Sequence, residues 1–238
     1  MTDHVLLGVF AHPDDETSCS AALMKRYAAG GVDIHVITAT RGEMGALGTN
    51  GKVITREELP KVREAEQRAV FEYLGVTNPP IYLDYRDQDV GNANREDVVL
   101  KVLAVMERVR PDIVLSFGRT GLSKHVDHIA MHHATLEAFH RYRALSSGEP
   151  ILYYWALTPT LVAQFELDIE GPEAAPHVFI DVSETWYAKI QALRMYTSQQ
   201  DAQDIAAAME GFEEKYELFH QAYPPLPDGA IHNDLFHD

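Results

Sequence analysis

Two short segments rich in histidine and aspartate each follow an apolar run, and they carry residue types that bind divalent metals. Residues 12–16 (HPDDE) come directly after the apolar run 5–10, and residues 125–128 (HVDH) follow the apolar run 113–117 and a glycine-containing turn. A purely structural turn would more often hold Gly, Asn or Ser. In an open parallel sheet, ligands bind beyond the carboxyl ends of the strands. We therefore expect the two segments to meet and form one metal site.

The residue types in these segments favour metal-assisted hydrolysis. His12, Asp15 and His128 offer two imidazoles and one carboxylate. That set suits a catalytic zinc with an open position, and Fe²⁺ or another divalent ion would fit nearly as well. Asp14 is adjacent to Asp15, so its side chain diverges and can take the proton of an attacking water. His125, when protonated, can stabilise a developing oxyanion.

Three neighbouring residues leave alternatives open. Asp127 can orient His125 or hold its proton, or it can serve as the N-cap of the helix that follows. His132 lies one helical turn after His128 and would be the fourth ligand if the site were a closed, structural zinc site. Cys19 could be a ligand or a nucleophile, but small residues surround it, which is typical of a packing surface.

The composition predicts one α/β domain that acts on a small molecule. A chain of 238 residues with 46% hydrophobic content can bury a large core. The formal net charge of −16 opposes binding to nucleic acid or to an anionic membrane. No basic and apolar leader begins the sequence, and no apolar window reaches the length of a membrane span. The single cysteine agrees with a reducing compartment, so we expect a cytoplasmic protein, and a homo-oligomer stays open.

The hydrophobic pattern alternates between strand-like and helix-like segments, which predicts a Rossmann-like, doubly wound α/β fold with a mainly parallel sheet. We expect a single domain over 1–238, in which 159–238 form a C-terminal elaboration. Strands are predicted at 5–10, 32–38, 81–83, 113–117, 151–155 and 177–182, and helices at 17–29, 60–74, 97–109, 127–140, 183–196 and 201–219.

Two predicted loops lie at the same edge of the sheet as the metal-seeking segments. The loop 41–52 holds four glycines, at 42, 45, 48 and 51, but it contains neither GxGxxG nor GxxxxGK[ST], which argues against a phosphate cradle. Glu43 is its residue of interest. The segment 84–89 is strongly charged, and composition alone favours a solvated loop.

The two segments together resemble the motifs of the LmbE-like (PIG-L) family of zinc-dependent de-N-acetylases. The sequence AHPDDE at 11–16 follows a first strand, and HVDH at 125–128 follows a later one. The resemblance covers at least residues 5–200 and implies a Rossmann-like fold. It also implies metal ligands at His12, Asp15 and His128, a general base at Asp14, and stabilisation of the tetrahedral intermediate by His125 with Asp127 beside it.

Weaker elements of the resemblance concern substrate binding. Glu43 matches a short GE-containing loop, and Arg63 matches a helix arginine that reaches the substrate in sugar-processing members. Asp87 matches an acidic loop near substrate hydroxyls. For Arg63 the alternative is an ion pair on the helix surface. Lys124 and Val126 replace the more usual Gly and Pro of the second motif, and residues 18–20 (SCS) replace the usual glycines after the first.

These inferences predict a zinc-dependent hydrolase that removes an acetyl group from an N-acetylated amino sugar, such as an N-acetylglucosaminyl conjugate. An amidase acting on thiol conjugates of the same sugar is a close alternative. A nucleotide- or sugar-binding module without catalysis is a more distant one, because the glycine fingerprint is absent and the set of three ligands plus a base is complete.

Overall fold

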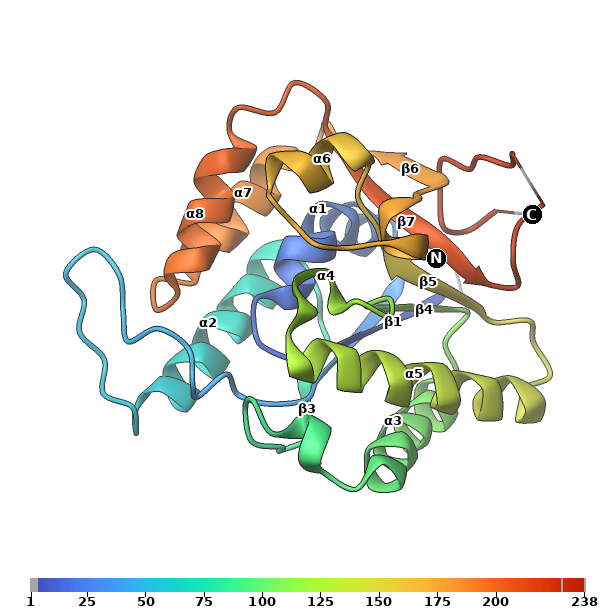
Figure 1. Cartoon of the computed structure of the whole chain (residues 1–238), viewed down its shortest axis with the longest axis horizontal. Coiled ribbons are helices and arrows are strands. Elements are labelled where there is room, and N and C mark those ends of the chain that lie inside the picture. The colour runs from blue at the N-terminus through green and yellow to red at the C-terminus, as the bar shows by residue number, and fades with distance from the viewer. Residues whose placement is uncertain (1–3, 228, 238) are drawn as a thin grey trace.

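A seven-stranded, mostly parallel sheet forms the centre of the molecule (Figure 1). The computed structural model describes residues 4–227 and 229–237. The strands lie in the order β3-β2-β1-β4-β5-β7-β6, and β7 runs antiparallel to both of its neighbours. Their bounds are β1 Val5–Phe10, β2 Asp33–Thr38, β3 Ile81–Tyr82, β4 Ile113–Ser116, β5 Ile151–Trp155, β6 Val178–Asp181 and β7 Tyr216–Tyr223.

Helices cover both faces of the sheet, so the predicted α/β class with a mainly parallel sheet is confirmed. Figure 1 shows α3 and α5 side by side on one face, while α1, α2, α7 and α8 gather on the other. The helices are α1 Asp15–Ala29, α2 Leu59–Leu74, α3 Arg95–Val109, α4 Gly121–Lys124, α5 Val126–Leu145, α6 Pro159–Gln164, α7 Trp186–Met195 and α8 Gln200–Met209, with short 3₁₀ turns at Val90–Asn92 and Gly171–Ala174.

The sheet order reverses beside β1, and this places the two metal-seeking segments together. β1 is buried on both faces because it is almost wholly apolar, and it pairs in parallel with β2 on one side and β4 on the other. Residues 12–16 leave the carboxyl end of β1, and residues 125–128 follow β4 by way of α4. Such a reversal leaves a crevice outside the strand ends, which is where ligands bind in open α/β sheets.

The C-terminal part of the chain differs from the sequence prediction. The single helix predicted at 201–219 is wrong, because α8 ends at Met209 and residues 216–223 form β7. The helix ends before Gly211, and pairing with β5 and β6 draws the aromatic-rich residues after it into the sheet. Elements after residue 159 are therefore built into the main sheet, whereas the division of the chain at 159 stays a prediction.

Candidate functional site

Ligand-type atoms of three residues converge at the carboxyl ends of β1 and β4. His12 Nδ1 lies 3.2 Å from His128 Nε2 and 3.5 Å from Asp15 Oδ2, and His128 Nε2 lies 3.3 Å from Asp15 Oδ1. Ligands about 2.0–2.2 Å from one zinc ion are separated from each other by distances of this size. His12, Asp15 and His128 are all less than a tenth exposed. The three residues predicted from the two segments therefore lie within 3.5 Å of one another, and their role as metal ligands stays a prediction.

The second nitrogen of each imidazole is hydrogen-bonded in a way that leaves the first one free as a ligand. His12 Nε2 lies 3.1 Å from Asp87 Oδ1 and 3.2 Å from Asp127 Oδ2, and His128 Nδ1 lies 2.9 Å from the carbonyl oxygen of Gly121. These oxygens can only accept, so those nitrogens carry the protons. With both rings neutral, the remaining lone pairs would face one point, where a bound cation could take the place of a proton between them.

The charge around His12 also fits a cation. Burial alone would lower the pKa of His12, but hydrogen bonds to Asp127, Asp15 and Asp87 outweigh it and raise that pKa well above its ordinary value. Burial likewise opposes ionisation of Asp15, yet the attraction of His128 and His12 holds its pKa well below the usual range. Asp15 Oδ2 in addition accepts the backbone N–H groups of Ala11 and His12. Three carboxylates around one imidazole form a site that favours positive charge.

Among the described residues, two groups of side chains have ligand-type atoms that all lie within 4.8 Å of one another, and neither contains Asp15. One consists of His12, His125 and His128, and the other of His12, Asp87, His125 and Asp127. The second group is less suited to a metal ion, because both oxygens of Asp127 already accept backbone N–H groups. These come from Val90 at 3.0 Å and Gln88 at 2.6 Å. Asp127 is fully buried, so its carboxylate ties the loop after β3 to His12.

Asp14 lies beside the three proposed ligands and is held by Arg63. Arg63 Nη2 donates to Asp14 Oδ2 at 2.7 Å and to the carbonyl oxygen of Pro13, while Nη1 donates to the carbonyl oxygen of Gly42 at 3.0 Å. The alternative of a surface ion pair for Arg63 is wrong, since only 4% of this residue is exposed. Burial raises the pKa of Asp14 well above its ordinary value, although the charge of Arg63 opposes that shift.

His125, and not Asp127, caps α5. The ring nitrogen Nδ1 of His125 accepts the backbone N–H of Asp127 at 3.2 Å, so the N-cap alternative for Asp127 is wrong. This bond places the proton of the neutral imidazole on Nε2, which can then donate to a ligand. Burial, followed by the charges of His12 and His128, lowers the pKa of His125. A neutral His125 can thus donate without first being protonated.

Hydrogen bonds join the loop at residues 43–44 to the loop at residue 87 beside the site. The Asp87 backbone N–H donates to Glu43 Oε1 at 2.8 Å, and Asp87 Oδ2 accepts the N–H of Met44 at the same distance. Asp87 is 5% exposed, so the prediction of a solvated loop is wrong at this position, although its neighbours Arg86 and Gln88 are exposed. The Glu43 carboxylate reaches the backbone of Asp87, whereas the Asp87 carboxylate reaches His12.

Several residues around the site were not predicted from sequence patterns. Glu16 is fully buried and accepts hydrogen bonds from Tyr196 at 2.6 Å and Gln67 at 2.9 Å, behind the segment 12–16. Asp201, from the start of α8, lines the same hollow as Asp14 and Arg63. Glu16 belongs to the motif and could have been identified there. Gln67, Tyr196 and Asp201 carry no local signal, because only the fold brings them near.

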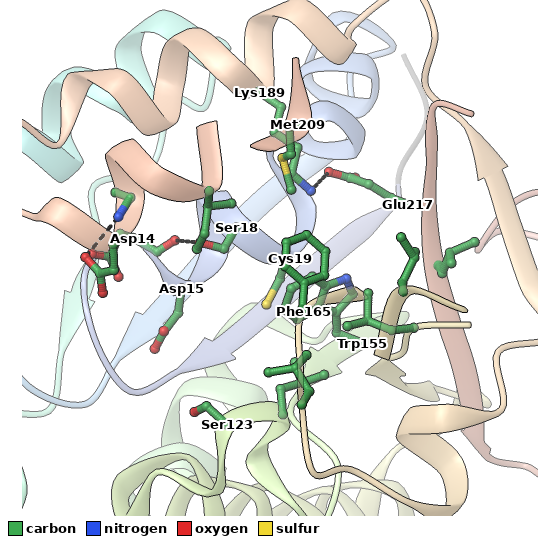
Figure 2. Close-up of a pocket in the computed structure, with 18 of the residues that line it drawn as sticks. Asp14, Asp15, Ser18, Cys19, Ser123, Trp155, Phe165, Lys189, Met209 and Glu217 are labelled. Atoms are coloured by element: carbon green, nitrogen blue, oxygen red, sulfur yellow. Dashed lines mark hydrogen bonds and ion pairs between the residues drawn. The ribbon is translucent and has the colours of Figure 1, made fainter. Parts of the chain in front are cut away.

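Two hollows open from the candidate metal site. A polar cleft is lined by Arg63, Asp87, Gln199 and Asp201, and an apolar cavity of about 320 Å³ extends to the other side. Asp14, Asp15 and His128 line both hollows. Figure 2 shows the apolar cavity, which includes the buried Cys19.

His132 takes no part in the metal site. Its Nδ1 donates to the carbonyl oxygen of Phe117 at 3.0 Å, and its ring packs against Tyr154. A fourth ligand at this position, and with it a closed structural site, therefore gains no support.

Comparison with known families agrees with the geometry. A family model described as "PIG-L: GlcNAc-PI de-N-acetylase" matches residues 7–139, which is more than half of the chain. The chain belongs to the PIG-L family. The match spans most of β1, both metal-seeking segments and most of α5, so the resemblance predicted from the motifs is confirmed. Within the described residues of this PIG-L chain, no helix is both long and apolar enough to cross a membrane.

Curated relatives in the PIG-L family are named for amide hydrolysis. The chain is 31% identical over 196 residues to a "Probable N-acetyl-alpha-D-glucosaminyl L-malate deacetylase 2" of Bacillus anthracis, covering 82% of this chain and 81% of that protein. It is 31% identical to a "1D-myo-inositol 2-acetamido-2-deoxy-alpha-D-glucopyranoside deacetylase" of Rhodococcus jostii, over 66% of this chain but 63% of that protein. It is 32% identical to a "Mycothiol S-conjugate amidase" of Streptomyces coelicolor, over 58% of this chain and 53% of that protein.

Solved structures confirm the fold over nearly the whole chain. The structure of a 4-carboxy-2-hydroxymuconate hydratase from Pseudomonas putida aligns with a TM-score of 0.71 at 21% identity, covering 96% of this chain and all of that one. An N,N'-diacetylchitobiose deacetylase from Pyrococcus horikoshii aligns with a TM-score of 0.65 at 20% identity, covering 91% of this chain and 83% of that one. The activities named for these two neighbours differ, so the fold alone does not specify the reaction.

Proposed function

We propose that this PIG-L protein is a zinc-dependent hydrolase that removes an acetyl group from an N-acetylated amino sugar. The observation that carries the proposal is the triangle of His12 Nδ1, Asp15 and His128 Nε2, whose atoms lie 3.2–3.5 Å apart, with Asp14 next to it. Fe²⁺ or another divalent ion fits the same donor set. The names of the deacetylase relatives support the choice of an amide substrate.

His12, Asp15 and His128 would hold the metal ion. A divalent ion at this position supplies Lewis acidity, which polarises a carbonyl oxygen and lowers the pKa of a water molecule. The Asp14 carboxylate accepts the proton of the attacking water and delivers it to the departing amine nitrogen. His125 Nε2–H donates to the oxyanion that forms on the carbonyl oxygen. Asp127 acts on His12, whose ring it orients through Nε2.

An N-acetylglucosaminyl conjugate is the proposed substrate class, and the polar cleft is the proposed sugar site. Arg63 and Asp87 line that cleft and can meet sugar hydroxyls, while Arg63 also positions Asp14. Glu43 does not line it, so we assign Glu43 to positioning Asp87. The amidase named among the relatives acts on an S-conjugate, which makes a bulkier amide the second candidate substrate.

The first experiment measures metal content and acetate release together. We expect about one zinc or iron per chain, with acetate release from N-acetylglucosaminyl compounds that a chelator abolishes and added metal restores. Asp14→Asn should keep the metal and lower kcat by about 10²–10⁴-fold, which is the usual contribution of a positioned general base. The control is Asp97→Asn, an exposed acid on α3, which should leave both quantities unchanged.

Two results would contradict this proposal. Full turnover in Asp14→Asn would remove the assigned base. A well-folded preparation that binds no divalent metal under any condition would remove the role of the triangle formed by His12, Asp15 and His128.

A further inference from the structure

The apolar cavity beside the candidate metal site is much larger than an acetyl group needs. Its volume is about 320 Å³. An engineered apolar protein cavity of about 150 Å³ already holds benzene. Aromatic and aliphatic side chains from β5, α6, α7 and α8 form its wall, and Figure 2 shows Trp155 and Phe165 on one side of it and Met209 on another. Such a wall recognises a hydrocarbon group rather than a sugar.

Away from the candidate metal site, the two charged groups that line this cavity, Lys189 and Glu217, pair with each other. Lys189 Nζ lies 2.7 Å from Glu217 Oε1, and the two residues are 2% and 1% exposed. The Glu217 carboxylate also accepts the backbone N–H groups of Ala22 and Leu23. The Cys19 thiol is buried beside them, and burial raises its pKa well above the ordinary value. A hydroxyl-rich ligand would therefore find few free partners there.

The two hollows meet at the residues proposed to act on the scissile amide. Asp14, Asp15 and His128 line both, so an amide carbonyl placed between them has one substituent in each hollow. The polar cleft is lined by Arg63 and Asp87, the residues proposed to meet sugar hydroxyls. The sugar nitrogen then lies on the polar side, and the acyl carbon chain extends into the apolar cavity. A group attached elsewhere on the sugar would lie a ring's width farther from the carbonyl.

We propose that the preferred substrates are amino-sugar amides whose acyl group is apolar and larger than acetyl, and that the acyl chain occupies this cavity. The inference rests on the proposed amide hydrolysis and specifies a larger, apolar acyl group as the one that is preferentially removed. Water supplies a hydroxyl group to the acyl carbon, the C–N bond breaks, and the nitrogen takes the remaining proton. The products are a carboxylic acid, which leaves the cavity, and the free amino sugar.

The test compares N-acetyl-, N-butanoyl-, N-hexanoyl- and N-octanoyl-glucosamine by release of the free amine. Each buried CH₂ contributes about 0.8 kcal/mol, or roughly fourfold in affinity. We therefore expect kcat/KM to rise at least tenfold from acetyl to hexanoyl. A kcat/KM that stays constant or falls as the acyl chain lengthens would overturn the proposal.

A matched pair of variants tests the location of the chain. Ile205→Phe enlarges a half-buried side chain that lines the cavity, and Leu145→Phe makes the same kind of change at a residue that is 72% exposed at the end of α5. Ile205→Phe should lower the hexanoyl-to-acetyl ratio of kcat/KM at least fivefold, and Leu145→Phe should preserve it. The same ratio in both variants would place the chain elsewhere and overturn the proposal.

Tryptophan fluorescence gives a readout that needs no turnover. The chain contains two tryptophans, Trp155 and Trp186, and both line the cavity. Titration with acetate, butanoate, hexanoate and octanoate should show emission changes whose Kd falls with chain length. If no amide of any length is hydrolysed, the proposed reaction fails, and this series still decides the assignment of the cavity. A Kd that falls with length supports it, and a Kd independent of length overturns it.

Discussion

Asp14 occupies a backbone conformation that residues other than glycine seldom adopt. Its φ is 101°, and it is the N-cap residue of α1, yet its side chain does not cap that helix. A positive φ at such a residue costs of order 1–3 kcal/mol, and such strain persists where the surroundings fix it. Here Arg63 binds both the Asp14 carboxylate and the carbonyl oxygen of Pro13. The Asp14 side chain therefore does not cap α1, and its carboxylate lies beside the proposed metal ligands instead.

The position of Arg63 in turn depends on the absence of a side chain at Gly42. A Cβ added at Gly42 would lie 2.0 Å from Arg63 Nη1, and φ there is +62°. We expect Gly42→Ala to displace the guanidinium, to lower kcat about 10–100-fold as disruption of supporting contacts does, and to destabilise the fold by about 1–3 kcal/mol. Metal content should not change, because Arg63 contacts Asp14 and none of the three proposed ligands. Amide turnover and urea unfolding measure these effects.

Gly51→Ala is the matched control for that experiment. Gly51 also has a positive φ, +83°, but a Cβ added there meets no atom within 4 Å. The control therefore carries the backbone strain without the clash, and its turnover should match that of the unaltered chain. Equal loss of turnover in both variants would show that the loop conformation, and not Arg63, matters.

The sequence predicts the site residues that lie inside short motifs and misses those that the fold supplies. Segments 12–16 and 125–128 contain the three proposed ligands, and their chemistry is visible from residue type and spacing. The contact between Asp127 and His12 was harder to predict. The Asp127 carboxylate also accepts the backbone N–H groups of Gln88 and Val90, in the loop after β3, which no local pattern shows. Asp201 is separated from Asp14 by most of the chain, so no local pattern could have joined them.

At the scale of elements, α1 is linked to β7 at a kink. Ser20 leaves helical angles, with φ −148° and ψ 17°, and the N–H groups of Ala22 and Leu23 bond the Glu217 carboxylate instead of helix carbonyls. Lys189 from α7 completes this contact with its buried amine. One carboxylate thus joins a helix, a second helix and a strand behind the apolar cavity.

Replacing one partner of the buried pair Lys189–Glu217 should lower the free energy of unfolding more than replacing both. Lys189→Met leaves Glu217 charged and unpaired, and breaking a buried ion pair in this way costs about 3–5 kcal/mol. Glu217→Gln added to Lys189→Met removes the stranded charge and keeps one oxygen that accepts a backbone N–H, so part of the loss should be recovered. Urea unfolding of both single variants and the double variant measures the coupling. Additive losses would show that the pair is not coupled.

Helices and strands were predicted correctly where the local pattern of apolar residues determines them. The strand at 5–10 and the strand at 151–155 have the predicted bounds, because continuous apolar runs end at polar or Pro-containing segments. Helical spacing of apolar residues continued past Gly211 and gave a helix where β7 lies. The decisive contribution was pairing with β5 and β6, which is a long-range interaction that no window of sequence contains.

At the scale of the whole molecule, buried histidines tie global stability to pH. His132 on α5 is 5% exposed, and burial lowers its pKa from 6.5 to about 4. Its neutral ring donates through Nδ1 to the carbonyl oxygen of Phe117, next to β4. In the unfolded chain the same side chain takes up a proton at about pH 6.5. The unfolded state therefore binds more protons between pH 6.5 and 4, and stability must fall as the pH falls through that window.

The expected loss from His132 is about 2 kcal/mol between pH 7.5 and 5, from the difference in proton uptake between the two states. His132→Asn retains a donor for the Phe117 carbonyl oxygen but does not titrate, so its free energy of unfolding should depend less steeply on pH by that amount. Urea unfolding of both proteins with a chelator present holds the candidate metal site in the same state. The remaining histidines and the acids titrate equally in both proteins, so the difference isolates His132. Parallel pH profiles would mean that His132 is protonated as readily in the folded protein as in the unfolded one, and its burial against Tyr154 would then contribute nothing to the acid limit of this fold.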